Sequence, residues 1–336
     1  LLVERGRGHP FPVLLAGRDA IVQAHTGTGK TAAFALPILE RLAPDGHGPQ
    51  ALVLTPTREL AIQVAEAIHR LGRYLEARVI ALYGGQPIER QLRALRHPVD
   101  IVVGTPGRIM DHLRRGTLRL DSVRTVVLDE ADEMLDMGFL DDVEWILERV
   151  PTERQTALFS ATMPARVREL ARRYLRKPVT IAIHPEHVTV PQIEQFVYEV
   201  AGTAKLDALA RILDFEAPAS AIVFVRTKSG ADELAHKLQA LGYAAEAIHG
   251  DLSQAMRDRA MQRFRSGQVD LLVATDVAAR GLDIPQVSHV INFDIPGDPE
   301  SYVHRIGRTG RAGSAGIAIT LVEPRERWLL RTIERA

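Results

Sequence analysis

Short apolar runs alternate with amphipathic stretches along the chain from Asp19 onward. This alternation is typical of parallel β-strands joined by crossover helices. The stretches 58–71 and 164–175 are interpreted as two such helices. In the first half the apolar runs predict strands at 19–24, 51–55, 78–82, 100–104, 124–129 and 156–160. These strands are rich in Val, Ile and Leu, so we expect helices to cover both faces of the sheet.

The alternation breaks at HPEHVTVPQ (184–192), where two prolines and several polar residues predict a linker. It resumes with predicted strands at 193–200, 221–225, 244–249, 269–275, 287–293 and 316–321. A chain of 336 residues is long for one compact domain and suits two of ordinary size. The sequence therefore predicts an α/β fold with two tandem doubly wound parallel-sheet domains, at 1–183 and 193–336.

Composition limits the classes of function. Hydrophobic residues make up 46% of the chain and charged residues 25%, which provides ample material for a core. The 42 basic and 42 acidic residues balance, which argues against a protein coated in positive potential but allows a local basic groove. No apolar run is long enough to span a bilayer. Cysteine is absent, which excludes disulfides and thiolate metal sites and favours the cytoplasm as location.

The first predicted strand leads directly into AHTGTGKT (24–31), and a helical stretch follows. A strand, a glycine-rich loop and a helix in this order form a phosphate cradle, because the loop N–H groups and the helix N-terminus point at the anion. Lys30 would reach the β- and γ-phosphates of a nucleotide, and the Thr31 hydroxyl would ligate Mg²⁺. Ala24 stands where the general pattern has glycine. The predicted nucleotide-binding residues of the loop are Ala24, Thr26, Gly27, Thr28, Gly29, Lys30 and Thr31.

Two acidic residues stand at the end of the apolar strand predicted at 124–129. Asp129 is its last residue, and Glu130 follows it. Both carboxylates are expected at the carboxyl edge of the sheet, where ligands of such sheets bind. Asp129 fits a holder of Mg²⁺, and Glu130 fits the group that orients and deprotonates an attacking water. An acidic helix start, stabilised by the helix dipole, is the alternative for Glu130 alone.

Several further motifs resemble one known family. Residues 129–132 spell DEAD, the motif that names the DEAD-box RNA helicases of superfamily 2. The matches follow the family's order: AHTGTGKT (24–31), PTRELA (56–61), GG (84–85), TPGR (105–108), DEAD (129–132), SAT (160–162), ATDVAARGLDI (274–284) and HRIGRTGR (304–311). The chain resembles a bacterial ATP-dependent RNA helicase of this family from Gly17 to about Leu321. The resemblance implies two RecA-like domains, an ATP-binding domain followed by a helicase C-terminal domain.

The resemblance also implies that RNA is held by its sugar-phosphate backbone. Glycine N–H groups, hydroxyls and arginines suit phosphate oxygens, which position a strand without reading its sequence. The implied RNA contacts are Thr57, Arg58, Gly84, Gly85, Thr105 and Arg108 in the first half and His249, Gly250, Gln254, Arg257, Thr275 and Asp276 in the second. For any one of them, an ordinary loop arginine or a helix-capping threonine is an equal alternative.

HRIGRTGR places arginines at 305, 308 and 311 with no carboxylate among them. The resemblance implies that Arg308 and Arg311 are arginine fingers, which stabilise charge on the transferring γ-phosphoryl group. Because the phosphate cradle belongs to the other domain, catalysis would require the two domains to close. The other implied contacts are His304 and Arg305 at the DEAD loop, Asp283 at the ribose, and Ser160 or Thr162 bonded back to the DEAD loop, with helix capping as the alternative for Thr162.

One departure from the family concerns the segment upstream of the phosphate cradle. The family usually carries a stretch resembling P-T-P-I-Q there, whose glutamine reads the adenine edge. This chain has RGRGHPFPVLLAGRDAIVQ (5–23), and no glutamine precedes Gln23, which belongs to the first strand. The segment is several residues shorter than the family's, so the sequence leaves open both the selectivity for ATP over GTP and the coupling to nucleotide binding.

The sequence thus predicts an ATP- and Mg²⁺-dependent RNA helicase that unwinds short duplexes locally and without sequence preference. Two alternatives stay open. One is an RNA clamp with the same fold and a weak or uncoupled ATPase. The other is a superfamily 2 relative that acts on DNA.

Overall fold

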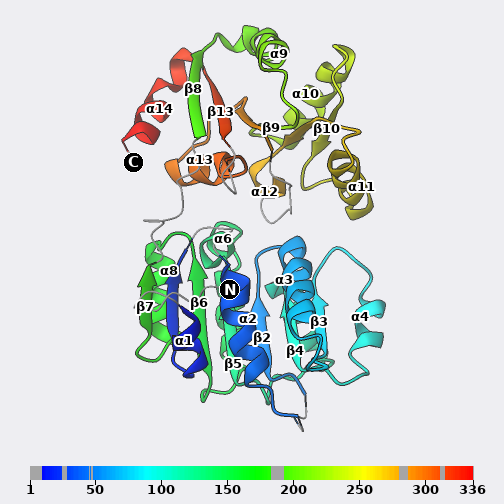
Figure 1. The fold of residues 1–336 in the computed structure, drawn as a ribbon, viewed down its shortest axis with the longest axis vertical. Coiled ribbons are helices and arrows are strands. Elements are labelled where there is room, and N and C mark those ends of the chain that lie inside the picture. Colours follow the sequence, from blue (N-terminus) through cyan, green and yellow to red (C-terminus); the bar gives the residue numbers. More distant parts are fainter. Residues whose placement is uncertain are drawn as a thin grey trace. The chain divides into compact units, whose positions relative to one another are not determined.

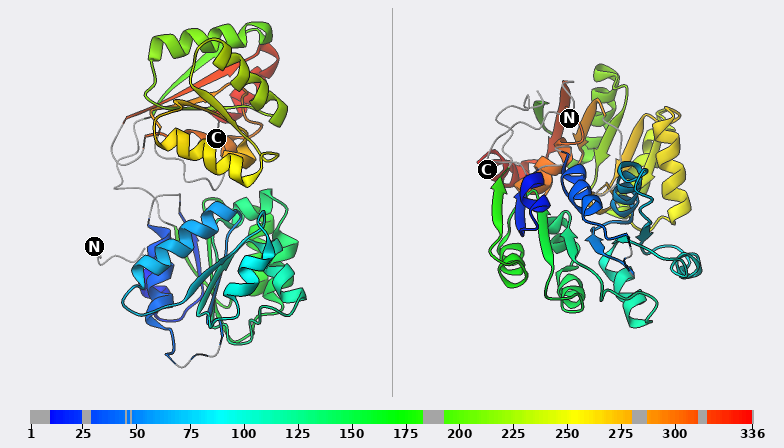
Figure 2. Two further views of the ribbon diagram at one scale, coloured as in Figure 1. Left: turned by 90° about the vertical axis from the view of Figure 1, so that its right-hand side faces the viewer. Right: turned by 60° about the horizontal axis from the view of Figure 1, so that its bottom comes forward.

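The computed structural model of the chain describes residues 10–24, 29–44, 46, 48–182, 193–279, 287–310 and 315–335. Its backbone divides into two compact units, Leu1–His184 and Pro185–Ala336. Each unit is a parallel sheet with helices on both faces, so the predicted α/β class is confirmed (Figures 1 and 2). The predicted linker at 184–192 lies outside the described residues.

The sheet of the first unit has the strand order β3-β4-β2-β5-β6-β1-β7, and each pair of neighbours runs parallel. Its strands are β1 (Ala20–Gln23), β2 (Ala51–Leu54), β3 (Val79–Leu82), β4 (Ile101–Gly104), β5 (Thr125–Leu128), β6 (Gln155–Ser160) and β7 (Val179–Ala182). β2, β4, β5 and β6 are buried at every position, as expected for strands covered on both faces. The edge strands β3 and β7 are partly exposed, so full coverage was a wrong expectation for the edge of the sheet.

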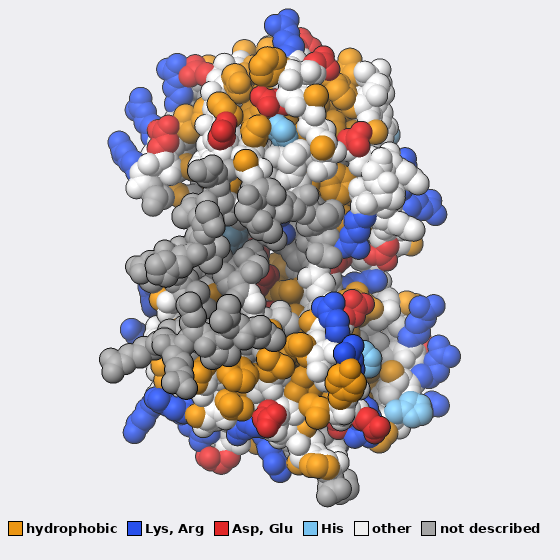
Figure 3. All heavy atoms as spheres, viewed as in Figure 1, with side chains coloured by type: hydrophobic (Ala, Val, Ile, Leu, Met, Phe, Trp, Pro, Cys, Tyr) orange, Lys and Arg blue, Asp and Glu red, His pale blue; other side chains and the backbone are white. Residues whose placement is uncertain are grey.

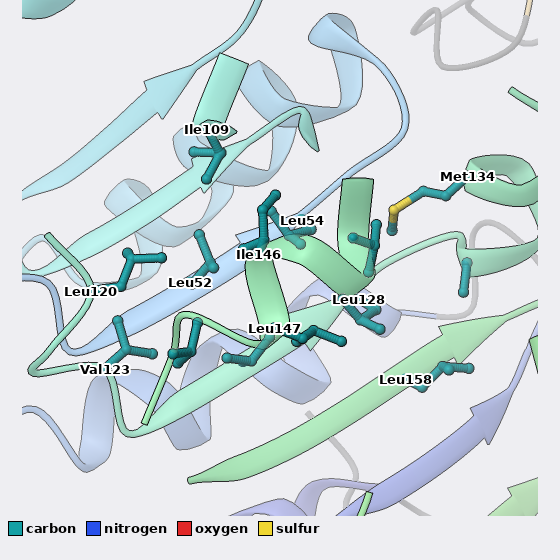
Figure 4. Close-up of a cluster of buried hydrophobic side chains, with 14 of the residues drawn as sticks. Leu52, Leu54, Ile109, Leu120, Val123, Leu128, Met134, Ile146, Leu147 and Leu158 are labelled. Atoms are coloured by element: carbon teal, nitrogen blue, oxygen red, sulfur yellow. The ribbon is translucent and has the colours of Figure 1, made fainter. Parts of the chain in front are cut away.

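Two apolar layers hold helices against this sheet. One layer joins α1, α2 and α3 to one face. The other joins α5, α6, α7 and α8 to the opposite face, and Figure 4 shows its side chains meeting between helix and sheet. The helices of this unit are α1 (Pro10–Leu15), α2 (Lys30–Glu40), α3 (Arg58–Leu71), α4 (Ile88–Ala94), α5 (Pro106–Arg114), α6 (Ala131–Asp136), α7 (Leu140–Leu147) and α8 (Ala165–Tyr174).

Strand β7 is the element of this sheet that the hydrophobic pattern missed. It pairs in parallel with β1, from Ala20 opposite Val179 to Gln23 opposite Ala182. Only Ile181 is buried along it, so it lacks the continuous apolar run that marks a central strand. A short edge strand is therefore set by its neighbour and not by its own sequence.

The second unit repeats the architecture with the strand order β10-β11-β9-β12-β13-β8. Its strands are β8 (Ile193–Glu199), β9 (Ala221–Phe224), β10 (Ala245–Ile248), β11 (Leu271–Ala274), β12 (His289–Asn292) and β13 (Gly316–Val322). Its helices are α9 (Lys205–Glu216), α10 (Lys228–Ala240), α11 (Gln254–Arg265), α12 (Asp276–Ala279), α13 (Pro299–Ile306) and α14 (Arg327–Glu334), with 3₁₀ turns at Gly202–Ala204 and Pro324–Glu326. α9 and α10 pack on one face of the sheet, and α11 and α12 on the other.

Basic and acidic side chains are interspersed over the described surface of each unit in the view of Figure 3. This distribution agrees with the balanced totals of 42 and 42. Among the described helices, none is both long and apolar enough to cross a membrane.

Candidate functional site

The strand order of the first sheet gathers the motif loops at one edge. Parallel strands all end on the same side, and ligands of such sheets bind at that carboxyl edge. The loops after β5, β6 and β1 begin at Asp129, Ala161 and Ala24, and those after β3, β4 and β2 begin at Tyr83, Thr105 and Thr55. The described nucleotide residues of this unit therefore lie on one half of the edge, and the predicted RNA residues of this unit lie on the other half.

The phosphate cradle is described from its glycine end. Gly29 precedes α2 with φ 80° and ψ 17°, a left-handed conformation that residues with a Cβ rarely adopt. Lys30 opens the helix and is 8% exposed, and its Nζ has no hydrogen-bond partner among the described residues. Burying an ammonium group without a partner costs free energy, and a bound anion would supply the missing partner. The predicted loop residues Thr26, Gly27 and Thr28 lie outside the described residues.

Asp129 leaves β5 beside this cradle and is 3% exposed. Its backbone N–H donates to the carbonyl of Leu54 at 2.9 Å, but Oδ1 has no hydrogen-bond partner among the described residues. Burial raises the pKa of Asp129, and the positive charge of Lys30 opposes that rise. An unpartnered carboxylate oxygen, together with the half-buried Thr31 hydroxyl, provides the hard oxygen donors that Mg²⁺ prefers. The residues present thus fit Mg²⁺.

Glu130 has the most unusual backbone of the predicted catalytic residues. It precedes α6 with φ 56° and ψ 56°, in the left-handed region. Such a conformation costs a non-glycine residue of order 1 kcal/mol or more and is concentrated at functional sites. The strain turns the chain sharply between β5 and α6, immediately after Asp129.

Asp132, the last residue of the DEAD motif, joins the loop after β5 to the loop after β6. Its Oδ2 accepts hydrogen bonds from Ala161 N at 3.0 Å, Thr162 N at 2.7 Å and the Thr162 hydroxyl at 3.1 Å. Its own N–H donates to Ser160 Oγ at 3.1 Å. The expected bonds from Ser160 and Thr162 to the DEAD loop are therefore present. Helix capping by Thr162 is not what the structure shows, because α8 begins after Pro164 without a side-chain cap.

On the other half of the edge, Arg58 lies at the start of α3 with its guanidinium 4.7 Å from the centre of the Tyr83 ring. A side chain at Gly85 would begin 3.8 Å from the same guanidinium. Thr57 caps α3 by accepting a hydrogen bond from Leu60 N, so the capping alternative holds for its hydroxyl. The PTRELA and GG motifs thus meet in space although they are more than twenty residues apart.

The TPGR motif reaches the same place from β4. Gly104 ends this strand so close to β3 that a Cβ there would lie 2.4 Å from the Leu82 carbonyl oxygen, which only glycine tolerates. Thr105 precedes α5 without capping it through its side chain. Arg108 donates to the Gln86 carbonyl and to Gln91 Oε1, both at 3.0 Å. The guanidinium is therefore held next to the GG loop.

In the second unit, four predicted RNA residues follow the neighbouring strands β10 and β11: His249 and Gly250 after β10, and Thr275 and Asp276 after β11. Thr275 N donates to the Ile248 carbonyl at 3.4 Å, which brings it next to His249 and Gly250. His249 is 4% exposed; its Nε2 lies 2.9 Å from Asp232 Oδ1, while its Nδ1 has no hydrogen-bond partner among the described residues. These residues form a second polar loop pair at a sheet edge.

The other two predicted contacts of this group are on α11. Gln254 donates to Asp258 Oδ1 at 2.7 Å, and Arg257 donates to the Ala278 carbonyl at 3.4 Å. The Arg257 bond ties α11 to α12, the helix that Asp276 begins.

Arg305 is paired within its own unit. It is 3% exposed, and its Nε and Nη2 bind both carboxylate oxygens of Asp276 at 2.6 and 2.8 Å. Its Nη1 donates to Asn292 Oδ1 and to the Asp294 carbonyl. Its guanidinium is therefore committed to groups of its own unit, and the role of His304 and Arg305 at the interface with the DEAD loop stays a prediction. The same pairing occupies the Asp276 carboxylate, which was predicted to contact RNA.

Arg308 follows the end of α13 and, with His304 and Asp276, lines a small pocket. The loop is anchored just beyond it, where the buried Thr309 hydroxyl contacts the Val287 carbonyl at 2.6 Å and the Ser288 carbonyl at 3.0 Å. Thr309 was not singled out from the sequence, where it is one small polar residue between glycines and arginines. The predicted residues Asp283 and Arg311 lie outside the described residues.

The arrangement agrees with the comparisons to known proteins. Residues 9–170 match the family DEAD/DEAH box helicase, and residues 204–313 match the family Helicase conserved C-terminal domain. The chain is 58% identical over 325 residues to the DEAD-box ATP-dependent RNA helicase CshA of Geobacillus kaustophilus and 56% identical to that of Bacillus subtilis. Each match covers 97% of this chain but 70% and 66% of the respective relative, so the chain spans about two thirds of their length.

Among solved structures, Saccharomyces cerevisiae Dbp5 bound to RNA and ADP BeF3 is similar with a TM-score of 0.84 and 36% identity, over 95% of this chain and 83% of that one. A DEAD box protein from Methanococcus jannaschii is 45% identical with a TM-score of 0.55, over 97% of this chain and 88% of that one. The match to CshA extends over 97% of the chain. With a fold and motif geometry to match, the chain belongs to the DEAD-box ATP-dependent RNA helicases.

Proposed function

We propose that the chain binds ATP with Mg²⁺ at one half of the first sheet edge and RNA at the other half, and hydrolyses ATP in response to RNA. The observation that carries this proposal is the division of the edge. Loops with unpartnered buried charges follow β5 and β1, while loops with glycines and arginines follow β3, β4 and β2.

We also keep the prediction of a cytoplasmic location, which the cysteine-free sequence favours.

The nucleotide half has the groups that triphosphate chemistry requires. Lys30 and the N-terminus of α2 bind phosphate oxygens, and Asp129 and Thr31 hold the metal ion. When bound, Mg²⁺ neutralises charge on the phosphate oxygens. Glu130, fixed by its strained backbone next to Asp129, orients the attacking water and accepts its proton.

The second unit supplies the groups that complete catalysis. We assign Arg308 and Arg311 to stabilising negative charge on the transferring phosphoryl group. Arg305 instead positions this segment by clasping Asp276, the residue after the predicted RNA contact Thr275. This pairing ties the segment after β11 to α13, and Arg308 follows the end of that helix.

RNA is gripped through its backbone, so its sequence matters little. Arg58 and Arg108 donate to phosphate oxygens, and the glycine N–H groups at 84 and 85 allow the strand to approach the protein backbone. An RNA strand held in this way would be separated locally from its partner strand when the duplex is short.

The test of this function is ATP turnover with a single-stranded RNA and with DNA of the same sequence. RNA is expected to raise turnover severalfold and DNA to raise it little, because the 2′-hydroxyl distinguishes the two polymers at a backbone-binding site. Phosphate release at rising polymer concentrations measures this. Equal stimulation by DNA would favour the DNA-directed alternative, and tight RNA binding without stimulation would favour the RNA clamp.

Nucleotide choice provides a second prediction. Gln23 ends β1 and donates its amide to the Ala161 carbonyl at 3.2 Å, so it serves as a tie between two strands and not as an adenine reader. A site built to hydrogen-bond a polar group discriminates by about 10⁴–10⁵, whereas a pocket without such a reader reaches only about 10²-fold. We therefore expect the kcat/KM values for ATP and GTP to lie within about 10²-fold of each other. A much stronger preference for ATP would show that another part of the chain reads the base.

A further inference from the structure

Gln91 is the buried centre of a hydrogen-bond network between the GG loop and helix α5. It lies on α4 and is 4% exposed. Its Nε2 donates to the Tyr83 carbonyl at 2.9 Å, and its Oε1 lies 3.0 Å from both Arg108 Nη1 and His112 Nε2. One side chain thus contacts three segments of the first unit.

The chemistry of the partners fixes the orientation of the amide. A carbonyl only accepts hydrogen bonds and a guanidinium only donates, so the NH₂ group must face Tyr83 and the oxygen must face Arg108. His112 Nε2 must then carry a proton to donate to the same oxygen. His112 has no exposed surface, and its Nδ1 lies 2.9 Å from the Thr117 hydroxyl. Burial, followed by the charge of Arg108, lowers the pKa of His112, which favours a neutral ring, and the bond to Gln91 then places its proton on Nε2.

Arg108 is held at two points by this network, at Gln91 Oε1 through Nη1 and at the Gln86 carbonyl through Nη2. These two bonds leave other N–H groups of the guanidinium fork for a phosphate oxygen. A long side chain loses rotamer freedom when it binds a ligand, and a side chain that is already fixed loses less.

We propose that Gln91 is a positioning residue that presents Arg108 and the GG loop to the RNA backbone as one preformed surface. The proposal rests on the proposed role of Arg108 as an RNA contact. Gln91 itself lies beneath that surface, where its two hydrogen-bonding ends match an acceptor on one side and two donors on the other. No other uncharged residue of this length offers both ends.

The test measures the RNA concentration that gives half-maximal stimulation of ATP turnover. Gln91→Ala is expected to raise it about five- to tenfold through lost preorganisation, with kcat at saturating RNA changed less than about twofold. Gln91→Met, which fills the space but makes neither hydrogen bond, is expected to raise it equally. The matched control is Gln50→Ala, since Gln50 is 6% exposed and bonds to the backbone of Ala43 at the opposite end of β2.

A double-mutant cycle separates this proposal from the role of Arg108. Because Gln91 acts partly through Arg108, adding Gln91→Ala to Arg108→Ala should raise the half-stimulating RNA concentration by a smaller factor than Gln91→Ala does in the unchanged chain. If the factors by which Gln91→Ala and Arg108→Ala raise the half-stimulating RNA concentration simply multiply in the double variant, Gln91 is not a positioning residue. The same holds if Gln50→Ala raises that concentration as much as Gln91→Ala does. If Arg108→Ala alone leaves RNA affinity unchanged, the proposed role of Arg108 fails first. Thermal unfolding of each variant confirms that the comparison is made on folded protein.

Discussion

Arg308→Ala is expected to lower RNA-stimulated ATP turnover by about 10³-fold or more, the loss that follows removal of an arginine finger. The residue lines a pocket with His304 and Asp276 and is followed at once by the anchored Thr309. The Thr309 hydroxyl anchors the backbone next to Arg308, so the guanidinium extends from a fixed point of the chain. The measurement is phosphate release at saturating ATP and RNA.

Two further variants sharpen the test of Arg308. Arg308→Lys keeps the charge but loses the planar fork, so it should restore little of the rate. Arg331→Ala removes an exposed arginine from α14 in the same unit and should behave as the unchanged chain. Turnover of Arg308→Ala close to that of Arg331→Ala would remove the arginine from the catalytic assignment.

Glu130→Gln is expected to lower the rate of hydrolysis by about 10²–10⁴-fold, because a carboxamide cannot accept the proton of the attacking water. The substitution preserves the shape of the side chain and should leave the bend after β5 in place. Nucleotide-dependent RNA binding should survive, since Lys30, Asp129 and the RNA loops are unaltered. Single-turnover hydrolysis and the fluorescence anisotropy of labelled RNA report the two properties separately.

The control for charge is Asp141→Asn, which removes an exposed carboxylate whose surface pair with Arg166 is 3.3 Å long. Surface pairs of this kind contribute little, so turnover should be unaffected. If Glu130→Gln hydrolyses ATP at the rate of Asp141→Asn, another group must act as the base. If it loses RNA binding as well, Glu130 has a structural role that the present assignment omits.

Much of the fold could be predicted because central parallel strands must be apolar on both faces. The predicted helix at 58–71 coincides with α3, and the predicted strand at 51–55 differs from β2 by one residue. β7 could not be predicted because its pairing with β1 and not its own pattern makes it a strand. β8 was predicted, yet it is exposed or half-exposed along its whole length, since it lies at the edge of its sheet.

The candidate site was predictable where chemistry is local in sequence. Gly29, Lys30 and Asp129 each follow from a strand, a loop and a helix read in order, and the structure places them at the edge that this order implies. The pairing of Arg305 with Asp276 could not be found in this way. The partners are 29 residues apart, and the absence of a nearby carboxylate in the sequence pointed away from an ion pair.

Neither the buried position of Gln91 nor the left-handed backbone of Glu130 could be predicted from the sequence, for different reasons. Gln91 is one polar residue in a predominantly surface-like stretch, and only the convergence of three segments shows that it is buried. The left-handed backbone of Glu130 is imposed by the turn from β5 into α6 and leaves no mark in residue type.

The hydrogen bonds between Asp132 and the segment after β6 have a consequence for how sequences of this family evolve. One carboxylate oxygen satisfies two backbone N–H groups and a hydroxyl, whereas a neutral histidine at 132 has one acceptor nitrogen and would leave at least two of these donors for some other group to satisfy. Positions 132 and 162, whose side chains bond to each other, should therefore vary together during evolution. A lineage that has altered only one of them should carry a compensating change elsewhere along the same two loops.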